Sequence, residues 1–200
     1  MNTNRRSFLK KAGAAGLAIA AGPSLITAKP SNTKIPDATA AFRLKYAPGL
    51  GMFSGHAGKD PIDNIKFCND MGFRAVFDNS FMGKPADLQE KIVRELSDRK
   101  MDLGPFVLYA DFSVTSFVLD KPEVKDMIRK KMKEGVECAK RTGAKWALVV
   151  PGRYDERLHR NYQTANVVDN LRLCADIVEK EGLTIVLEPL NTLQSHPGLF

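Results

Sequence analysis

Apolar residues recur every three or four positions in four stretches of the chain, which is the spacing that a helix with one buried face requires. Three stretches span residues 61–71, 85–99 and 122–141, and the fourth is marked by Val167, Leu171, Cys174 and Val178. Gly143 and Gly182 follow the third and fourth stretches. A glycine in the left-handed conformation often ends a helix at such a position. The pattern therefore predicts four helices.

Short apolar runs, several of them rich in β-branched residues, lie between these helices and predict strands. The five runs are residues 44–47, 74–77, 103–109, 146–150 and 184–187. They begin about 30 to 40 residues apart, which is the length of a strand, a helix and their loops, so the strands should form a parallel sheet. The run at 146–150 is apolar throughout. We expect both of its faces to be covered.

Two folds use this alternation, an open doubly wound sheet and a closed (β/α)8 barrel. The open sheet favours a phosphate loop of the form GxGxxG, and Gly49, Gly51 and Gly55 match it poorly because they are spaced GxGxxxG. We interpret these glycines as a loop on the active face. A closed barrel needs about 250 residues and eight strands. Residues 42–200 are therefore predicted to be an α/β chain holding about the first five strands of a TIM barrel.

The open edges of such a partial barrel would be exposed to other chains. No helical pattern follows the last strand to cover it. We therefore expect this sequence to be the front part of a longer protein.

The first 28 residues have the pattern of an export signal. Arg5 and Arg6 are followed by a stretch, 12–26, that carries no charge, and residues 26–28 (Ile-Thr-Ala) are suited to cleavage. The stretch is shorter than the roughly 20 strongly apolar residues that span a bilayer. We predict a twin-arginine signal peptide at 1–28, a linker at 29–41, and a periplasmic or otherwise exported protein.

The net charge of +7 is lower once the signal is removed. Four of the seven units belong to the signal, so about three remain for the mature protein. Nucleic acids and membrane surfaces bind clustered basic residues. The basic run at 129–131 is typical of the solvated face of a helix, so neither partner is predicted.

Familiar catalytic and metal-binding motifs do not match this sequence. It has no GxSxG elbow, HExxH helix or Walker loop, so serine or cysteine hydrolysis is unsupported. Cys68, Cys138 and Cys174 are odd in number and widely spaced, which favours neither a disulfide framework nor a metal site. We predict that they are small buried hydrophobic residues.

The functional face of a parallel α/β fold lies at the carboxyl ends of its strands. Glu188 directly follows the run 184–187, and Pro189 keeps it extended. A carboxylate at that place is costly unless it is paired, hydrated or bound to metal. We interpret it as an acid/base group or a ligand of a hard divalent ion such as Mg²⁺ or Mn²⁺. The alternative is a surface contact with a lysine or a helix terminus.

Other polar residues follow the predicted strands on the same face. We assign substrate binding to four of them: His56, Arg153, Asn191 and His196. Arg153 could neutralise an anionic substrate through its fork of donors. An ion pair with Asp155 or Glu156 of its own loop explains it equally well. Each histidine could polarise a carbonyl or be solvated.

Several segments resemble the hydroxypyruvate isomerase family within the xylose isomerase-like TIM barrels. The matching segments are residues 58–61, 65–67, 71–75, 150–157, 162–166 and 187–191. The resemblance implies a divalent-metal barrel, with Zn²⁺ as a further candidate metal and a homo-oligomer as a possible assembly. It implies that Glu188 is a metal ligand and a member of the acid/base pair.

The implied reaction is an aldose-ketose type isomerisation of a small sugar or hydroxy-keto acid. A proton leaves the carbon beside a carbonyl, a metal stabilises the enediolate, and the proton returns to the neighbouring carbon.

The chain departs from that family at strand two, where many relatives have a glutamate and this chain has Phe77. Asp78 follows one place later, and it is either functional or a turn residue. The other ligands that the family would supply come from strands beyond residue 200, so the chain alone is not expected to be active.

Two other classes stay open. An endonuclease IV-like phosphodiesterase would need a multi-histidine zinc cluster and a basic groove. A non-catalytic carbohydrate-binding barrel would keep the fold without the ligands.

Overall fold

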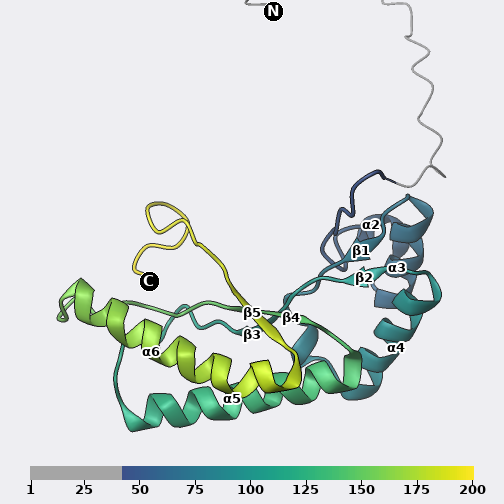
Figure 1. The fold of residues 1–200 in the computed structure, drawn as a ribbon. Helices are drawn as coiled ribbons and strands as arrows, with labels where there is room; N and C mark the ends of the chain where they lie inside the picture. Colours follow the sequence, from purple (N-terminus) through teal and green to yellow (C-terminus); the bar gives the residue numbers. More distant parts are fainter. Residues whose placement is uncertain (1–41) are drawn as a thin grey trace, which may run out of the picture. The chain divides into compact units, whose positions relative to one another are not determined.

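The computed structural model describes residues 42–200 (Figure 1). The predicted signal peptide, 1–28, and the predicted linker, 29–41, lie outside the described residues.

All four predicted helices are present. They are α3 (Pro61–Asp70), α4 (Ala86–Asp98), α5 (Pro122–Thr142) and α6 (Arg160–Val178). Gly143 and Gly182 adopt the left-handed conformation, with φ of 71° and 68°, and end the third and fourth helical segments as predicted. Three short pieces were not predicted, namely α2 (Ser54–Ala57), η1 (Phe81–Gly83) and η2 (Glu179–Glu181).

The described strands pair in parallel throughout. β1 (Ala75–Val76) pairs with β2 (Asp102–Leu103), and a second sheet has the order β3-β4-β5. These strands are β3 (Phe106–Tyr109), β4 (Trp146–Val149) and β5 (Thr184–Leu187). The prediction of parallel βα units is confirmed, and the fifth strand has the predicted bounds.

The first predicted strand, 44–47, is wrong in position. Those residues are exposed and pair with no strand among residues 42–200. The pairing with the β1 segment begins later in the chain, at an isolated bridge between Gly49 and Phe77. The amide of Leu50 donates to the Phe77 carbonyl at 2.7 Å, and the Phe77 amide donates to Pro48 at 3.1 Å.

The predicted strand 103–109 is two strands that serve different sheets. Gly104 and Pro105 separate β2, which pairs with β1, from β3, which pairs with β4. Pro105 has no amide to donate to a ladder. Gly104 passes so close to Phe77 that a Cβ would lie 2.9 Å from the Phe77 Cβ. The break is therefore a consequence of local sequence and of a close approach between neighbouring segments.

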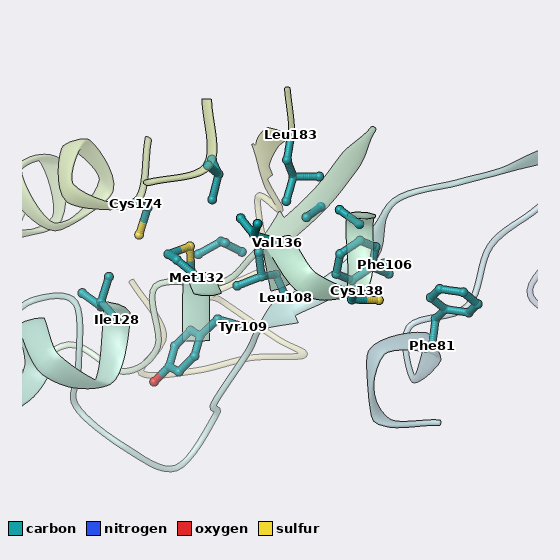
Figure 2. Packing of buried hydrophobic residues seen from close by; sticks show 14 of the residues in the cluster. Phe81, Phe106, Leu108, Tyr109, Ile128, Met132, Val136, Cys138, Cys174 and Leu183 are labelled. Carbon is teal, nitrogen blue, oxygen red and sulfur yellow. The ribbon is translucent and has the colours of Figure 1, made fainter. Parts of the chain in front are cut away.

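Helices cover one face of the β3-β4-β5 sheet. In Figure 1, α5 and α6 lie together on one side of these strands. Figure 2 shows Phe106 and Leu108 of β3 packing toward Met132 and Val136 of α5. A doubly wound sheet has helices on both faces, whereas a barrel has them only outside, so this layering favours the barrel.

We predicted that both faces of β4 would be covered, and this is wrong at Trp146. Ala147 and Val149 are fully buried, but Trp146 is 50% exposed and lies on the alternate face. Successive side chains of a strand point to opposite faces. On the face of Trp146, Leu148 is half-buried and Val150 is buried, so the exposure is confined to the start of the strand.

The three cysteines are free thiols and all are buried, which confirms their prediction as core residues. Burial raises the pKa of each thiol, and that of Cys174 to about 12. Among residues 42–200, no helix is both long and apolar enough to cross a bilayer.

Candidate functional site

Three segments meet beyond the carboxyl ends of β3, β4 and β5. The segment after β4 runs between the other two, because Arg153 forms one bridge to Thr115 and another to Leu199. The Tyr154 amide donates to Gly198 at 3.1 Å, and the Phe200 amide donates to Gly152 at 2.9 Å. The residues after β4 and β5 therefore form a joined surface on the predicted functional face.

Glu188 lies at the end of β5, at the place predicted for it. Its amide donates to the Val149 carbonyl at 3.4 Å, which continues the parallel ladder with β4 by one residue. The side chain is exposed. Within residues 42–200, no ion pair reaches its carboxylate. The carboxylate is thus accessible to a small molecule.

Arg153 is half-buried, and its guanidinium lies against Gly198. Gly198 has φ of 83°, and a Cβ there would be 2.8 Å from Nη2 of Arg153. The ion pair of this loop is made by Arg157, whose Nη2 lies 2.8 Å from Oδ2 of Asp155. Hydrogen bonds from Arg157 lower the pKa of Asp155 to about 2. The intraloop ion pair that was the alternative role of Arg153 is therefore formed by another arginine.

His196 and Asn191 belong to the loop after β5. The imidazole of His196 packs against the Phe112 ring with centroids 5.2 Å apart, and its amide donates to the Asn191 carbonyl at 2.9 Å. The Asn191 Oδ1 accepts from the amides of Leu193 and Gln194, both at 3.1 Å. Asn191 therefore shapes its own turn, and its role in substrate binding stays a prediction.

His56 lies apart from these residues in the sequence and in its contacts. It is in α2, a four-residue helix, and its ring stacks on Phe67 of α3 at 5.9 Å. The side chain is exposed. Among residues 42–200, no hydrogen bond or ring contact joins it to the surface formed after β4 and β5.

Asp78 forms a turn. Its Oδ1 accepts from the amide and the hydroxyl of Ser80 at 3.0 and 2.8 Å, and Oδ2 lies 2.9 Å from Lys84 Nζ. The carboxylate is buried, with Oδ1 engaged in the turn and Oδ2 in an ion pair. The structure thus supports the turn interpretation of this residue.

Several residues that organise this face were not selected from the sequence. The Tyr109 hydroxyl bonds Ser116 Oγ at 2.9 Å, and Ser116 Oγ donates to the Pro151 carbonyl at 3.1 Å. Asp111 Oδ1 accepts from the amides of Ser113 and Val114. Only the spacing of Asp111 and Ser113 gives a signal in the sequence, because Asp followed two residues later by Ser favours a turn of this kind.

A cavity of about 310 Å³ opens beside the segment after β4. Its lining includes Tyr154, Asp155, Arg160, Thr192 and Leu199. Glu188 and Arg153 are not part of that lining.

Glu188 is suited by chemistry to a hard divalent ion, which prefers oxygen ligands. The part of the chain that the structure describes has no group of three or more His, Cys, Asp or Glu side chains that could hold a metal ion. One carboxylate does not make a metal site, so the described residues by themselves do not fit the predicted ion.

Solved structures share this fold at low sequence identity. An AP endonuclease of family 2 from Brucella melitensis has a TM-score of 0.63 at 21% identity, over 78% of this chain and 58% of its own. D-psicose 3-epimerase from Clostridium cellulolyticum H10 has a TM-score of 0.60 at 11% identity, over 76% and 55%. The 3-keto-D-glucoside 4-epimerase from E. coli has a TM-score of 0.56 at 16% identity, over 77% and 59%.

This chain therefore spans less than two thirds of the length of these three proteins. No curated protein sequence matches it significantly. The family model described as xylose isomerase-like TIM barrel matches residues 65–199. That match covers more than half of the chain and runs from within α3 to beyond β5. The predicted fold class, an incomplete TIM barrel, is confirmed, and the chain belongs to the xylose isomerase-like TIM barrel family.

Proposed function

We propose that the whole protein is an isomerase or epimerase of small sugars or hydroxy-keto acids, with hydroxypyruvate among its candidate substrates. The observation that carries the proposal is the exposed carboxylate of Glu188, placed directly after β5. Two of the three similar structures are named as sugar epimerases, which supports this reaction class. Strand-end residues of such barrels commonly carry the chemistry.

Glu188 would act as the base. Its carboxylate takes the proton from the carbon beside the substrate carbonyl, the C–H electron pair moves into the enediolate, and the carbonyl oxygen becomes the developing oxyanion. The carboxylic acid then returns the proton to the former carbonyl carbon, while the hydroxyl proton of the first carbon passes through water to the oxyanion, so that the carbonyl and the hydroxyl exchange positions. A base of this kind contributes about 10² to 10⁴ in rate when it lies within hydrogen-bond reach of the proton.

Arg153 and His196 supply polar groups on the same joined surface. Arg153 is a donor for the carboxylate of a hydroxy-keto acid or for sugar hydroxyls. His196 lies on the segment that pairs with the Arg153 segment, so both can approach one ligand. A divalent ion bound through Glu188 would need further ligands from the whole barrel. Metal analysis of the purified protein tests this, and an ion at one equivalent supports it.

The experiment that tests the function is a turnover assay on hydroxypyruvate and a panel of small ketoses. Glu188→Gln should lower kcat at least a hundredfold, because the amide cannot take a proton. Glu181→Gln is the matched control, since Glu181 lies before β5, at the opposite end of the same strand, and pairs with Lys140. Equal turnover by the Glu188→Gln variant and wild type would refute the role of Glu188.

The same preparation should be offered DNA with an abasic site, because one similar structure is named as an AP endonuclease. Cleavage of that DNA without turnover of any sugar would replace the proposal with phosphodiester chemistry. Binding of sugars without turnover would support a non-catalytic barrel.

We also propose export by the twin-arginine pathway, which rests on the pattern of residues 1–28. A reporter protein fused behind these residues should reach the periplasm. Changing Arg5 and Arg6 together to lysine should retain it in the cytoplasm. Export of the double variant at the wild-type level would argue against this pathway.

A further inference from the structure

Three helices carry a buried amide side chain at their fourth residue. These residues are Asn64 of α3, Gln89 of α4 and Gln163 of α6, with relative exposures of 1%, 1% and 2%. Buried amides are rare unless their hydrogen bonds are satisfied. Because the three amides share a helix position and are all buried, we expect them to have the same structural role.

Each of these amides bonds the backbone of the loop that leads into its own helix. Asn64 Nδ2 donates to the carbonyls of Gly58 and Asp60 at 2.7 and 2.9 Å. Gln89 Nε2 donates to three carbonyls of the preceding loop, those of Phe81, Met82 and Lys84, at 2.8 to 3.2 Å. The amides therefore hold loops that connect strand ends to the following helices.

Gln163 bonds its loop through both the donor and the acceptor of its amide. Its Oε1 accepts from the Asp155 amide at 2.8 Å, and its Nε2 donates to the carbonyls of Asp155 and Leu158 at 2.9 and 2.8 Å. Both N–H donors of the amide are used, and the acceptor is used as well. One side chain thus fixes both polar backbone groups of Asp155.

The loop before α5 has no such residue, because the fourth position of α5 is Lys125, which pairs with Asp120. That loop is held from α6 instead. Asn166 Nδ2 donates to Val118, and Asn170 Nδ2 donates to Phe117 and Leu119 at 2.9 and 3.1 Å. Asn170 therefore bonds a different loop from Gln163 while sharing its helix and its burial.

We propose that Gln163 is a positioning residue for the functional face, in that it sets the path of residues 153–158 and so the placement of Arg153. The segment it fixes pairs directly with the segment that carries His196, through the bond from Tyr154 to Gly198. The claim that Gln163 affects substrate binding rests on the proposed function. Its structural part, that one amide orders this loop, stands independently.

The test compares Gln163→Met with Asn170→Leu in the full chain. Methionine keeps the length of the side chain and removes all three bonds. Amide hydrogen exchange should become about tenfold faster at Asp155 in the Gln163→Met variant, because one hydrogen bond of ordinary strength is lost there. Asn170→Leu should speed exchange around residues 117–119 and leave Asp155 near the wild-type rate. Gln163→Glu keeps the acceptor for the Asp155 amide and should show intermediate exchange.

Kinetics provide the second measurement. Gln163→Met should raise KM for the sugar about tenfold while kcat changes less, which is the pattern for loss of uniform binding by Arg153. Asn170→Leu should raise KM less than Gln163→Met does, because Asn170 makes no bond to residues 153–158. Wild-type exchange at Asp155 in both Gln163 variants, or equal acceleration at Asp155 by Asn170→Leu, would overturn the proposal. If wild type turns over no sugar, the proposed function fails, and the exchange data still decide the role of Gln163.

Discussion

Gly135 of α5 lies against Leu108 of β3. We predict that Gly135→Ala destabilises the protein when Leu108 is present and stabilises it when Leu108 is shortened. Gly135 is in the interior of a 21-residue helix and is buried. A Cβ added to it would lie 2.6 Å from Cγ of Leu108, far inside normal van der Waals contact. Cγ can move away only if Leu108 changes its χ1 rotamer or the strand shifts. The glycine therefore lets α5 approach the sheet closely.

Helix propensity and overpacking change the free energy of unfolding in opposite directions. Alanine in place of a helix-interior glycine stabilises by about 1 kcal/mol. Overpacking a close-fitting core costs about 1 to 3 kcal/mol, and contact with Cγ places this site toward the upper end. Gly135→Ala should therefore lower the free energy of unfolding by about 2 kcal/mol.

The same change should become favourable once Leu108 is shortened. Leu108→Ala alone should cost about 2 to 5 kcal/mol, because Leu108 is only 3% exposed. In that background the obstructing atoms are gone, and Gly135→Ala should stabilise by about 1 kcal/mol. The coupling between the two sites is then about 3 kcal/mol, at the top of the range for residues in contact.

Urea unfolding of the four proteins measures this coupling. Trp146 is the single tryptophan of the chain and is half exposed on β4, so its fluorescence reports on the sheet. The midpoints and slopes give the four free energies of unfolding. If Gly135→Ala destabilises both backgrounds equally, or stabilises wild type, the close approach of α5 to Leu108 is wrong.

Three further predictions follow from single sites. Gln89→Leu should lower the free energy of unfolding by about 3 kcal/mol, measured by urea unfolding, because it leaves three carbonyls and the Arg141 guanidinium without their partner. The pKa of Asp155 is lowered to about 2, so its bond to Arg157 is fully present above the ordinary pKa of 3.8 and is lost as the pH falls through about 2. Arg157→Gln should raise the pKa of Asp155 toward 3.8, which NMR of the carboxyl carbon measures. Cys174, whose pKa is raised to about 12, should resist iodoacetamide at pH about 8 in the folded chain and react in urea; rapid labelling without urea would contradict its burial.

The sequence was sufficient for elements whose signals are local. The strand at 184–187 is bounded by Gly182 and by Glu188-Pro189, and it has the predicted limits. Helix α5 ends where its glycine turns left-handed. Both features depend on residues within a few positions of each other, so periodicity and turn chemistry suffice.

Other elements depend on partners far along the chain. The first predicted strand failed because Phe77 pairs with Pro48 and Leu50, not with 44–47. Helix α6 begins at Arg160, two turns before its first apolar marker, Val167. Its first turns are secured by Gln163, which bonds a loop, and polar residues of this kind carry no apolar periodicity.

Some features of the candidate site could likewise be predicted from the sequence, and others could not. The positions of Glu188 and Arg153 at strand ends followed from the alternation of elements alone. The partner of Asp155, the packing of His196 on Phe112 and the turn made by Asn191 depend on side-chain geometry. No spacing in the sequence distinguishes Arg157 from Arg153 as the partner of Asp155.

Solvent hydrogen exchange into the substrate tests the central claim most directly. The purified protein is incubated in D₂O with hydroxypyruvate and with small ketoses, and proton NMR follows the hydrogens on the carbon beside the carbonyl. We predict that wild type and Glu181→Gln replace these hydrogens with deuterium, and that Glu188→Gln is slower by a factor of about 10² or more. Deuterium uptake at the wild-type rate in the Glu188→Gln variant would contradict the account of Glu188 as the group that moves the proton.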